Sequence, residues 1–265
     1  MLHYRPKGWR ENMRRVRALV RFSLIFFVLT PVLFGIRLAV WPSAYYSEAL
    51  DRRFRRKLLQ FWNRCFAKIA GIEVVTHGLP PQPPFYIVAN HLSYLDMLLV
   101  THQTGSIFVS REDVQYWPVI GFMARSLYII FIDRQDRRDT VRVNKLIEHA
   151  IRMGDGIAVF PESRISCGRD VEPFKSSLIE PAVANRIPVH YATITYETLP
   201  GCPPANKIVG WWRPEPFFAH LFRLLSYRGM TATIRFGEQA VVGSDRKELS
   251  ERLHQAVRAQ FLPLK

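Results

Sequence analysis

The chain has 265 residues, of which 48% are hydrophobic, 13% aromatic and 22% charged. This composition suits one folded domain with an appendage and excludes a disordered or collagen-like protein. Three cysteines at irregular spacing (Cys65, Cys167 and Cys202) exclude a disulfide framework and a cysteine-rich zinc site, and they indicate a reducing compartment.

The net charge of +15 is concentrated near the N-terminus. Residues 1–70 contain fifteen Lys and Arg residues against three acids, a net +12 that leaves +3 for the rest of the chain. Such asymmetry indicates an anionic partner, either nucleic acid or phospholipid headgroups. An uncharged run, FSLIFFVLTPVLFGI, lies inside this basic region between Arg21 and Arg37. We therefore expect a phospholipid membrane surface as the partner, and no nucleic acid.

The apolar run is short for a membrane span. As a helix it covers about 22 Å, whereas a bilayer core is about 30 Å thick. It reaches across only if it extends from Leu19 to Trp41 with flanking arginines at the headgroups. Basic clusters on both sides fit better with one anionic leaflet and a hydrophobic helical hairpin kinked at Pro31. We expect the second arm to be a helix from about Ser47 to Ala70, which has a broad apolar face.

The expected hairpin with its basic flanks indicates the cellular location of the protein. We expect the cytoplasmic face of a membrane, the inner membrane if the chain is bacterial. Monotopic attachment and a single N-terminal span both stay open, with the hairpin preferred.

From Phe85 onward, short apolar runs rich in β-branched and aromatic residues alternate with polar stretches. This alternation predicts an α/β domain with a mixed, partly parallel sheet flanked by helices. Helices are expected from Asp139, which would cap the first, to Gly154, and from Ser244 to Leu262. Residues 71–84 are the expected boundary between a basic, helical membrane-associating region, 1–70, and the α/β domain, 71–265. The expected strands are residues 85–89, 106–109, 127–132, 156–160, 188–196 and 231–236.

The strand at 85–89 runs directly into NHLSYLD, residues 90–96. The carboxyl end of a buried strand is where an α/β domain usually builds a site. His91 can act as a general base, and Asp96 can reach back to orient it if a helix begins at once. The structural alternative is a capping Asn90, a hydrogen-bonded His91 and a surface Asp96.

Two more strand ends carry polar groups. The strand at 127–132 ends in Asp133 and Arg134, and the strand at 156–160 is followed by PESRIS. Guanidinium groups beside a base suit a phosphate or carboxylate headgroup, because Arg binds such oxyanions bidentately. The alternatives are a solvated Arg134 and a structural Glu162. No G-x-S-x-G or H-E-x-x-H motif occurs, so neither a serine hydrolase elbow nor a metal site is expected.

Residues 90–96 resemble the N-H-x-x-x-x-D signature of the glycerolipid acyltransferases, the 1-acyl-sn-glycerol-3-phosphate acyltransferase family. Residues 110–134 are similar to the second block of this family and end in the same F-I-D-R. Phe160-Pro161-Glu162 resembles the start of the third block, and Ile187-Pro188-Val189 the fourth. The resemblance covers roughly residues 70–240, and the ordered set is more specific than any single motif.

The resemblance implies transfer of a fatty acyl group from acyl-CoA or acyl carrier protein to the free hydroxyl of a lysophospholipid-type acceptor such as lysophosphatidic acid. His91 would be the general base and Asp96 would orient it, without a covalent acyl-enzyme. The donor is a co-substrate, and no cofactor or metal is implied. The implied substrate-binding residues are Arg134, Glu162, Ser163, Arg164 and Ser166.

The third block departs from the family pattern. F-P-E-G-T-R-S is usual there, whereas this chain has F-P-E-S-R-I-S, which places Ser163 on the Gly and moves the guanidinium to Arg164. The departure falls on the part of the motif that serves the acceptor headgroup. A lyso-aminolipid such as lyso-ornithine lipid is therefore an alternative acceptor. A non-catalytic membrane-bound lipid-binding protein with the same fold, or a hydrolase using water, also stays open.

Overall fold

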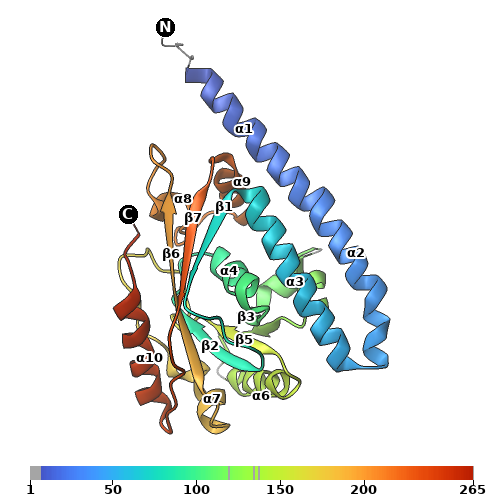
Figure 1. The fold of residues 1–265 in the computed structure, drawn as a ribbon, viewed down its shortest axis with the longest axis vertical. Coiled ribbons are helices and arrows are strands. Elements are labelled where there is room, and N and C mark those ends of the chain that lie inside the picture. The colour runs from blue at the N-terminus through green and yellow to red at the C-terminus, as the bar shows by residue number, and fades with distance from the viewer. Residues whose placement is uncertain (1–6, 119, 134, 137, 265) are drawn as a thin grey trace.

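The computed structural model describes residues 7–118, 120–133, 135–136 and 138–264. These residues build a seven-stranded sheet in the order β1-β7-β6-β2-β5-β3-β4, with helices on both faces (Figure 1). β6 and β7 pair antiparallel, and all other neighbouring strands pair parallel. The predicted mixed, partly parallel sheet flanked by helices is confirmed. The strands are β1 (Ile72–His77), β2 (Phe85–Ala89), β3 (Ile107–Arg111), β4 (Ile130–Ile132), β5 (Gly156–Val159), β6 (Val189–Thr198) and β7 (Met230–Phe236).

The strand predictions differ from the structure by more than two residues at two places, and the other predicted ends lie within two residues of the observed ones. The strand expected at 127–132 begins only at Ile130, because Tyr128 adopts a left-handed conformation (φ 59°) that interrupts an extended chain. β1 lies in the stretch that we expected to be a boundary, and it pairs with β7 at the edge of the sheet. Its sequence lacks a regular alternation, since Val74 and Val75 are adjacent, so the pattern did not reveal it.

Helices cover both faces of the sheet. Alternate side chains of β2 enter two separate cores: Phe85 and Ile87 pack with α3, α4 and α9, whereas Tyr86 and Val88 pack with α6, α7 and α10. β2 is therefore buried on both faces and gives a rigid base to the residues that follow it. The α-helices are α1 (Lys7–Ser23), α2 (Thr30–Val40), α3 (Glu48–Ala70), α4 (Leu95–Thr104), α5 (Ile120–Ser126), α6 (Asp139–Arg152), α7 (Glu180–Ala184), α8 (Ala205–Ile208), α9 (Phe217–Ser226) and α10 (Arg246–Gln260).

The two helices expected in the α/β region are found, with shifted ends. α6 ends at Arg152, two residues before Gly154, and its N-cap is Arg138. Asp139, predicted as the cap, lies in the first turn and accepts a hydrogen bond from the Asp133 amide (2.7 Å). α10 is capped by Asp245, whose side chain accepts from the amides of residues 247 and 248.

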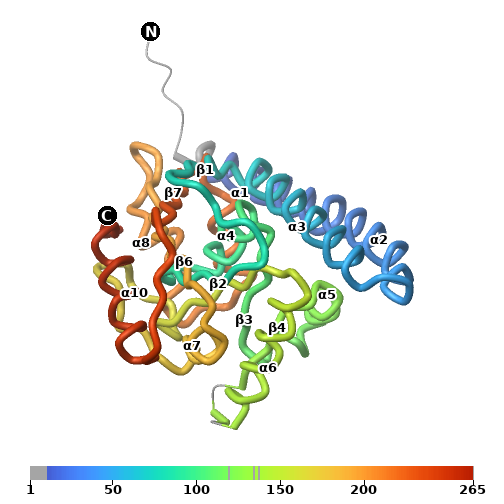
Figure 2. The backbone as a smooth tube through the Cα atoms, turned by 60° about the horizontal axis from the view of Figure 1, so that its bottom comes forward, coloured from blue at the N-terminus to red at the C-terminus, as the bar shows by residue number. Residues whose placement is uncertain are grey.

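The N-terminal helices form a hairpin whose first arm is continuous. α1, the π-helical segment η1 (Leu24–Leu29) and α2 follow one another, and this arm runs alongside α3 in both views (Figures 1 and 2). Residues Glu11–Tyr45 are long and apolar enough to cross a membrane. Pro31 does not end the helix. Proline has no backbone N–H to donate, and the π-helical segment η1 ends two residues before Pro31. The 3₁₀ turn η2 (Trp41–Tyr45) leads into α3, which Ser47 caps and Gly71 (φ 75°) ends.

The second arm of the hairpin is part of the main core. Phe66 and Ala70 of α3 are buried in the same cluster as β2. Arg52 and Arg55 form buried ion pairs with Asp155, which precedes β5. The boundary that we placed at residue 70 stays a prediction, and α3 packs as an element of the α/β core.

Candidate active site

The segment after β2 is fixed to β6. Asn90 is buried and makes two hydrogen bonds with Ile194: its Nδ2 donates to the carbonyl oxygen (3.0 Å), and its Oδ1 accepts from the amide (2.7 Å). These bonds continue the pairing of the two strands beyond Ala89. The capping role considered for Asn90 is thus wrong, because the N-cap of α4 is Tyr94.

His91 and Asp96 lie in direct contact. His91 Nδ1 is 2.9 Å from Oδ2 of Asp96, which is fully buried in the first turn of α4. The same Oδ2 accepts hydrogen bonds from the amides of Leu92 (2.5 Å) and Ser93 (2.8 Å). The loop therefore folds around the carboxylate, and the alternative of a surface Asp96 is excluded. With Nδ1 donating to a carboxylate, the neutral ring presents Nε2 as a proton acceptor.

The His91 ring is held from one side by an aromatic ring. It stacks on Phe160, with centroids 4.5 Å apart and planes at 26°, and it retains 8% exposure. Phe160 directly follows β5, which neighbours β2. The two strand ends thus orient the imidazole while leaving it accessible.

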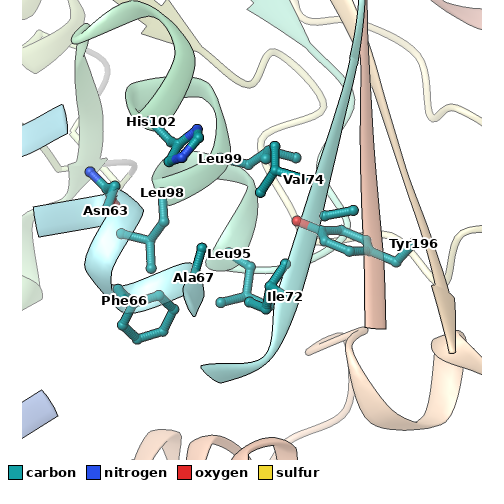
Figure 3. Close-up of a pocket in the computed structure, with 11 residues that line it drawn as sticks. Asn63, Phe66, Ala67, Ile72, Val74, Leu95, Leu98, Leu99, His102 and Tyr196 are labelled. Atoms are coloured by element: carbon teal, nitrogen blue, oxygen red, sulfur yellow. The ribbon is translucent and has the colours of Figure 1, made fainter. Parts of the chain in front are cut away.

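Tyr196 is a member of this site that our sequence analysis missed. It lies on β6, and its hydroxyl donates to Asp96 Oδ1 at 2.7 Å. In Figure 3 its hydroxyl oxygen points toward α4, the helix that carries Asp96. Burial, followed by the charge of Asp96, raises the pKa of this phenol well above its usual range, so it remains a donor. The strand was predicted, but no local signal showed that this residue would meet a carboxylate 100 positions away.

Glu162 binds backbone amides with both carboxylate oxygens. Oε1 accepts from the His91 amide (2.6 Å), and Oε2 accepts from the Glu172 amide (3.1 Å). The side chain is buried, and burial raises the pKa of Glu162 to about 8. The structure thus places this residue behind the His91 loop.

The other third-block residues are divided between the loop and the surface. Ser163 has a left-handed backbone (φ 61°), the conformation that favours glycine at this motif position. The Ser166 amide donates to the His91 carbonyl oxygen (2.9 Å). Arg164 is 71% exposed and pairs with Glu172 (2.7 Å). Arg134 lies outside the described residues.

A hydrogen bond links the His91 loop to the hairpin through α9. The Tyr94 hydroxyl lies 3.0 Å from Nδ1 of His220, and burial lowers the pKa of His220 to about 4, so it stays neutral. At the other end of α9, Arg17 donates to the carbonyl oxygen of Ser226 (2.8 Å), and Arg21 donates to that of Tyr227 (2.6 Å). α9 therefore connects α1 with the loop that carries His91.

A small apolar cavity lies beside the pair, between α3, α4 and the sheet (Figure 3). Its volume is about 20 Å³, room for about one water molecule. Leu95 and Tyr196 are among the residues that line it. Within the described ranges, no group of three or more His, Cys, Asp or Glu side chains is placed to hold a metal ion.

Comparison with known proteins gives a consistent result. The acyltransferase family model matches residues 71–195. The lyso-ornithine lipid O-acyltransferase of Rhodobacter capsulatus is 32% identical over 203 residues, which are 74% of this chain and 72% of that protein. The 1-acyl-sn-glycerol-3-phosphate acyltransferase of Neisseria gonorrhoeae is 28% identical over 197 residues, 71% of this chain and 74% of that protein. The crystal structure of the 1-acyl-sn-glycerophosphate acyltransferase PlsC of Thermotoga maritima, at 20% identity, superposes with a TM-score of 0.69 and covers 93% of this chain and 95% of that one.

Proposed function

Because the chain belongs to the acyltransferase family, we propose that it moves a fatty acyl group from a thioester donor to the free hydroxyl of a lysolipid, with His91 as the general base. The observation that carries the proposal is the 2.9 Å contact between His91 Nδ1 and the buried Asp96. The donor is acyl-CoA or acyl carrier protein, and no cofactor takes part.

The proposed reaction is a single acyl transfer. Nε2 of His91 takes the proton of the acceptor hydroxyl while its oxygen attacks the thioester carbonyl. Asp96 fixes the tautomer and stabilises the imidazolium that forms. The tetrahedral intermediate collapses with cleavage of the carbon–sulfur bond, and the thiolate takes up the proton. The products are an ester and a free thiol, so no acyl-enzyme forms.

The third-block residues are proposed to divide two tasks. Glu162 and Ser166 hold the His91 loop, since both make hydrogen bonds to its backbone. Arg164, with its exposed guanidinium, is proposed to contact the acceptor headgroup. Ser163 places Arg164 through its left-handed backbone. Arg134 is proposed as a headgroup ligand from its motif position.

Of the two acceptor types, we favour lyso-ornithine lipid. Four relatives named for that acceptor match 203–252 residues at 27–32% identity, whereas the Neisseria gonorrhoeae relative named for 1-acyl-sn-glycerol-3-phosphate matches 197 residues at 28%. Arg164 is paired with Glu172, so this part of the surface presents both charge signs. An ornithine headgroup carries an ammonium and a carboxylate, which suits such a pair better than a phosphate dianion does.

The hairpin is proposed to dock on the cytoplasmic leaflet. Its first arm exposes large apolar side chains, among them Phe27 (73% exposed) and Val32 (57%). Exposed apolar surface of this kind on a basic helix is typical of interfacial membrane binding. Docking lets a lysolipid present its hydroxyl to His91 while its acyl chain stays in the membrane. Exposing that chain to water would cost about 0.8 kcal/mol for each CH₂ group.

The test is acyl transfer from radiolabelled donor to lyso-ornithine lipid, lysophosphatidic acid and other lysolipids, using the wild type, His91→Ala and Asp96→Asn. We expect transfer by the wild type and a loss of at least about 100-fold in His91→Ala. Each lysolipid is tested with acyl-CoA and with acyl carrier protein. Full activity in folded His91→Ala would refute the mechanism. Binding of lysolipid without transfer from either donor would favour the non-catalytic lipid-binding alternative.

A further inference from the structure

The Asp96 carboxylate receives four hydrogen bonds, unequally divided between its oxygens. Oδ2 accepts from His91 Nδ1 and from the amides of Leu92 and Ser93. Oδ1 accepts from the Tyr196 hydroxyl, the hydrogen-bond donor that it has among the described residues. Both side chains are at most 2% exposed, so no solvent competes for this bond. Such a bond between a buried neutral donor and a carboxylate is stronger than an ordinary one.

β6 holds the His91 loop at two points that are two residues apart. Ile194 fixes Asn90 through its backbone, and Tyr196 fixes Asp96 through its side chain. Residues 194 and 196 point to the same face of the strand because side chains alternate. The strand therefore sets both the start of the loop and the position of the carboxylate that ends it.

We propose that Tyr196 is a positioning residue for acyl transfer, acting on His91 through Asp96; this inference rests on the proposed function of that pair. The phenol takes part of the negative charge of the carboxylate and fixes its plane. Asp96 then holds the imidazole in the tautomer that accepts a proton at Nε2. Without the phenol, the carboxylate attracts the His91 imidazolium more strongly and is free to rotate.

The other ionisable groups around the pair come from its own loop and from two other segments. Glu162 after β5 binds the His91 amide, Tyr94 lies in the same loop, and His220 of α9 contacts Tyr94. None of these three residues is hydrogen-bonded to the Tyr196 hydroxyl, whose bond in the described residues goes to Asp96. A change in the pH profile of a variant without this hydroxyl therefore reports on the pair.

The experiment compares Tyr196→Phe with Tyr86→Phe in the full-length protein. Tyr86 is a matched control: it is fully buried on the adjacent β2, and its hydroxyl donates to the carbonyl oxygen of Leu178, on the other face of the sheet. For Tyr196→Phe we expect kcat to fall on the order of tenfold with KM for lysolipid unchanged. The acid limb of its pH profile should move up by roughly half a unit to one unit. Tyr86→Phe should keep both the rate and the profile.

A double-mutant cycle identifies the route of the effect. In an Asp96→Asn background, Tyr196→Phe should cause no further loss, because the partner through which it acts is already altered. If Tyr196→Phe fails to fold, 3-fluorotyrosine at position 196 replaces it. This more acidic phenol donates a stronger bond and should move the acid limb to lower pH.

The outcomes separate this inference from the proposed function. Loss of activity in His91→Ala together with an unchanged rate and profile in Tyr196→Phe would overturn the role of Tyr196 alone. Equal losses in Tyr196→Phe and Tyr86→Phe would show a merely structural effect and overturn it as well. Full activity in His91→Ala would overturn the proposed function itself.

Discussion

Arg37 and Asp51 form a buried ion pair that joins the two arms of the hairpin. Nη1 lies 2.5 Å from Oδ1 and Nη2 lies 3.0 Å from Oδ2, and both side chains are at most 1% exposed. Arg37 also donates to the carbonyl oxygen of Ser126 at the end of α5, and the Tyr128 hydroxyl donates to Asp51. One cluster therefore fixes the angle between α2, α3 and the segment before β4.

Breaking this pair from one side should destabilise the protein strongly. Arg37→Met leaves Asp51 buried without its countercharge, a cost of about 3–5 kcal/mol. We expect a large drop in the thermal unfolding midpoint, measured in detergent, and faster proteolysis near residues 41–47. The double variant Arg37→Met/Asp51→Leu should recover much of the loss, because no charge stays unpaired. A single variant as stable as the wild type would contradict the role of this cluster.

Glu162 should make stability depend on pH. Burial raises its pKa to about 8 from the ordinary value of 4.5, so between these values the folded protein holds a proton that the unfolded chain has released. The stabilisation by this group is fully present below about pH 4.5 and is lost as pH rises through about 8. Relative to Glu162→Gln, the wild type should therefore lose thermal stability between pH 5 and 9. Parallel melting curves for the two proteins across this range would contradict a neutral Glu162.

Glu172 should influence which headgroup is accepted. It pairs with the exposed Arg164 through its side chain, whereas its contact with Glu162 uses only its backbone amide. Glu172→Gln therefore frees the guanidinium without removing the hydrogen bond behind the His91 loop. We expect the ratio of kcat/KM for lysophosphatidic acid to that for lyso-ornithine lipid to rise by about three- to tenfold, typical of an exposed charge. Arg246→Gln, which breaks the comparably exposed pair with Glu180, is the control and should leave this ratio unchanged.

Local features of this structure could be predicted from the sequence, whereas most contacts between distant residues could not. β2 and the helix at α3 were predictable because their apolar patterns and flanking residues are local signals. The pairing of His91 with Asp96 was also predictable, since five residues separate them. β1 was not predicted, because an edge strand of six residues needs little alternation of apolar and polar residues. The role of Tyr196 was not predicted for a different reason. Its contact with Asp96 depends on where β6 lies relative to β2, and strand order is a property of the whole fold.

The residues of the third block also divide into features that the motif predicted and contacts that it did not. The motif comparison placed Ser163 at a position usually held by Gly, and the left-handed backbone at Ser163 is a conformation that favours Gly. It gave no indication that Glu162 would face backbone amides, or that Arg164 would pair with Glu172. These contacts depend on the return of the chain at residue 172, which no spacing within the motif encodes.

The exposed face of the first hairpin arm gives the sharpest test of membrane docking. Deleting residues 1–70 would also remove Phe66 and Ala70 from the core, so a point substitution is the cleaner experiment. Phe27→Glu places a charge on the apolar face and removes a side chain whose burial contributes about 1.5–3 kcal/mol. Binding to vesicles of anionic phospholipid should weaken by about 10- to 100-fold, with a parallel loss of activity on vesicle-borne acceptor. Activity on a short-chain, water-soluble lysolipid should persist.

The control for this substitution is Leu79→Glu, in the loop between β1 and β2. Leu79 is also highly exposed, at 88%, but it lies outside the hairpin. Leu79→Glu should keep vesicle binding and activity on both acceptors, because its side chain has no place in the proposed membrane contact. Equal loss of vesicle binding in the two variants would assign docking to another surface. Undiminished binding in Phe27→Glu would show that this arm stays outside the leaflet.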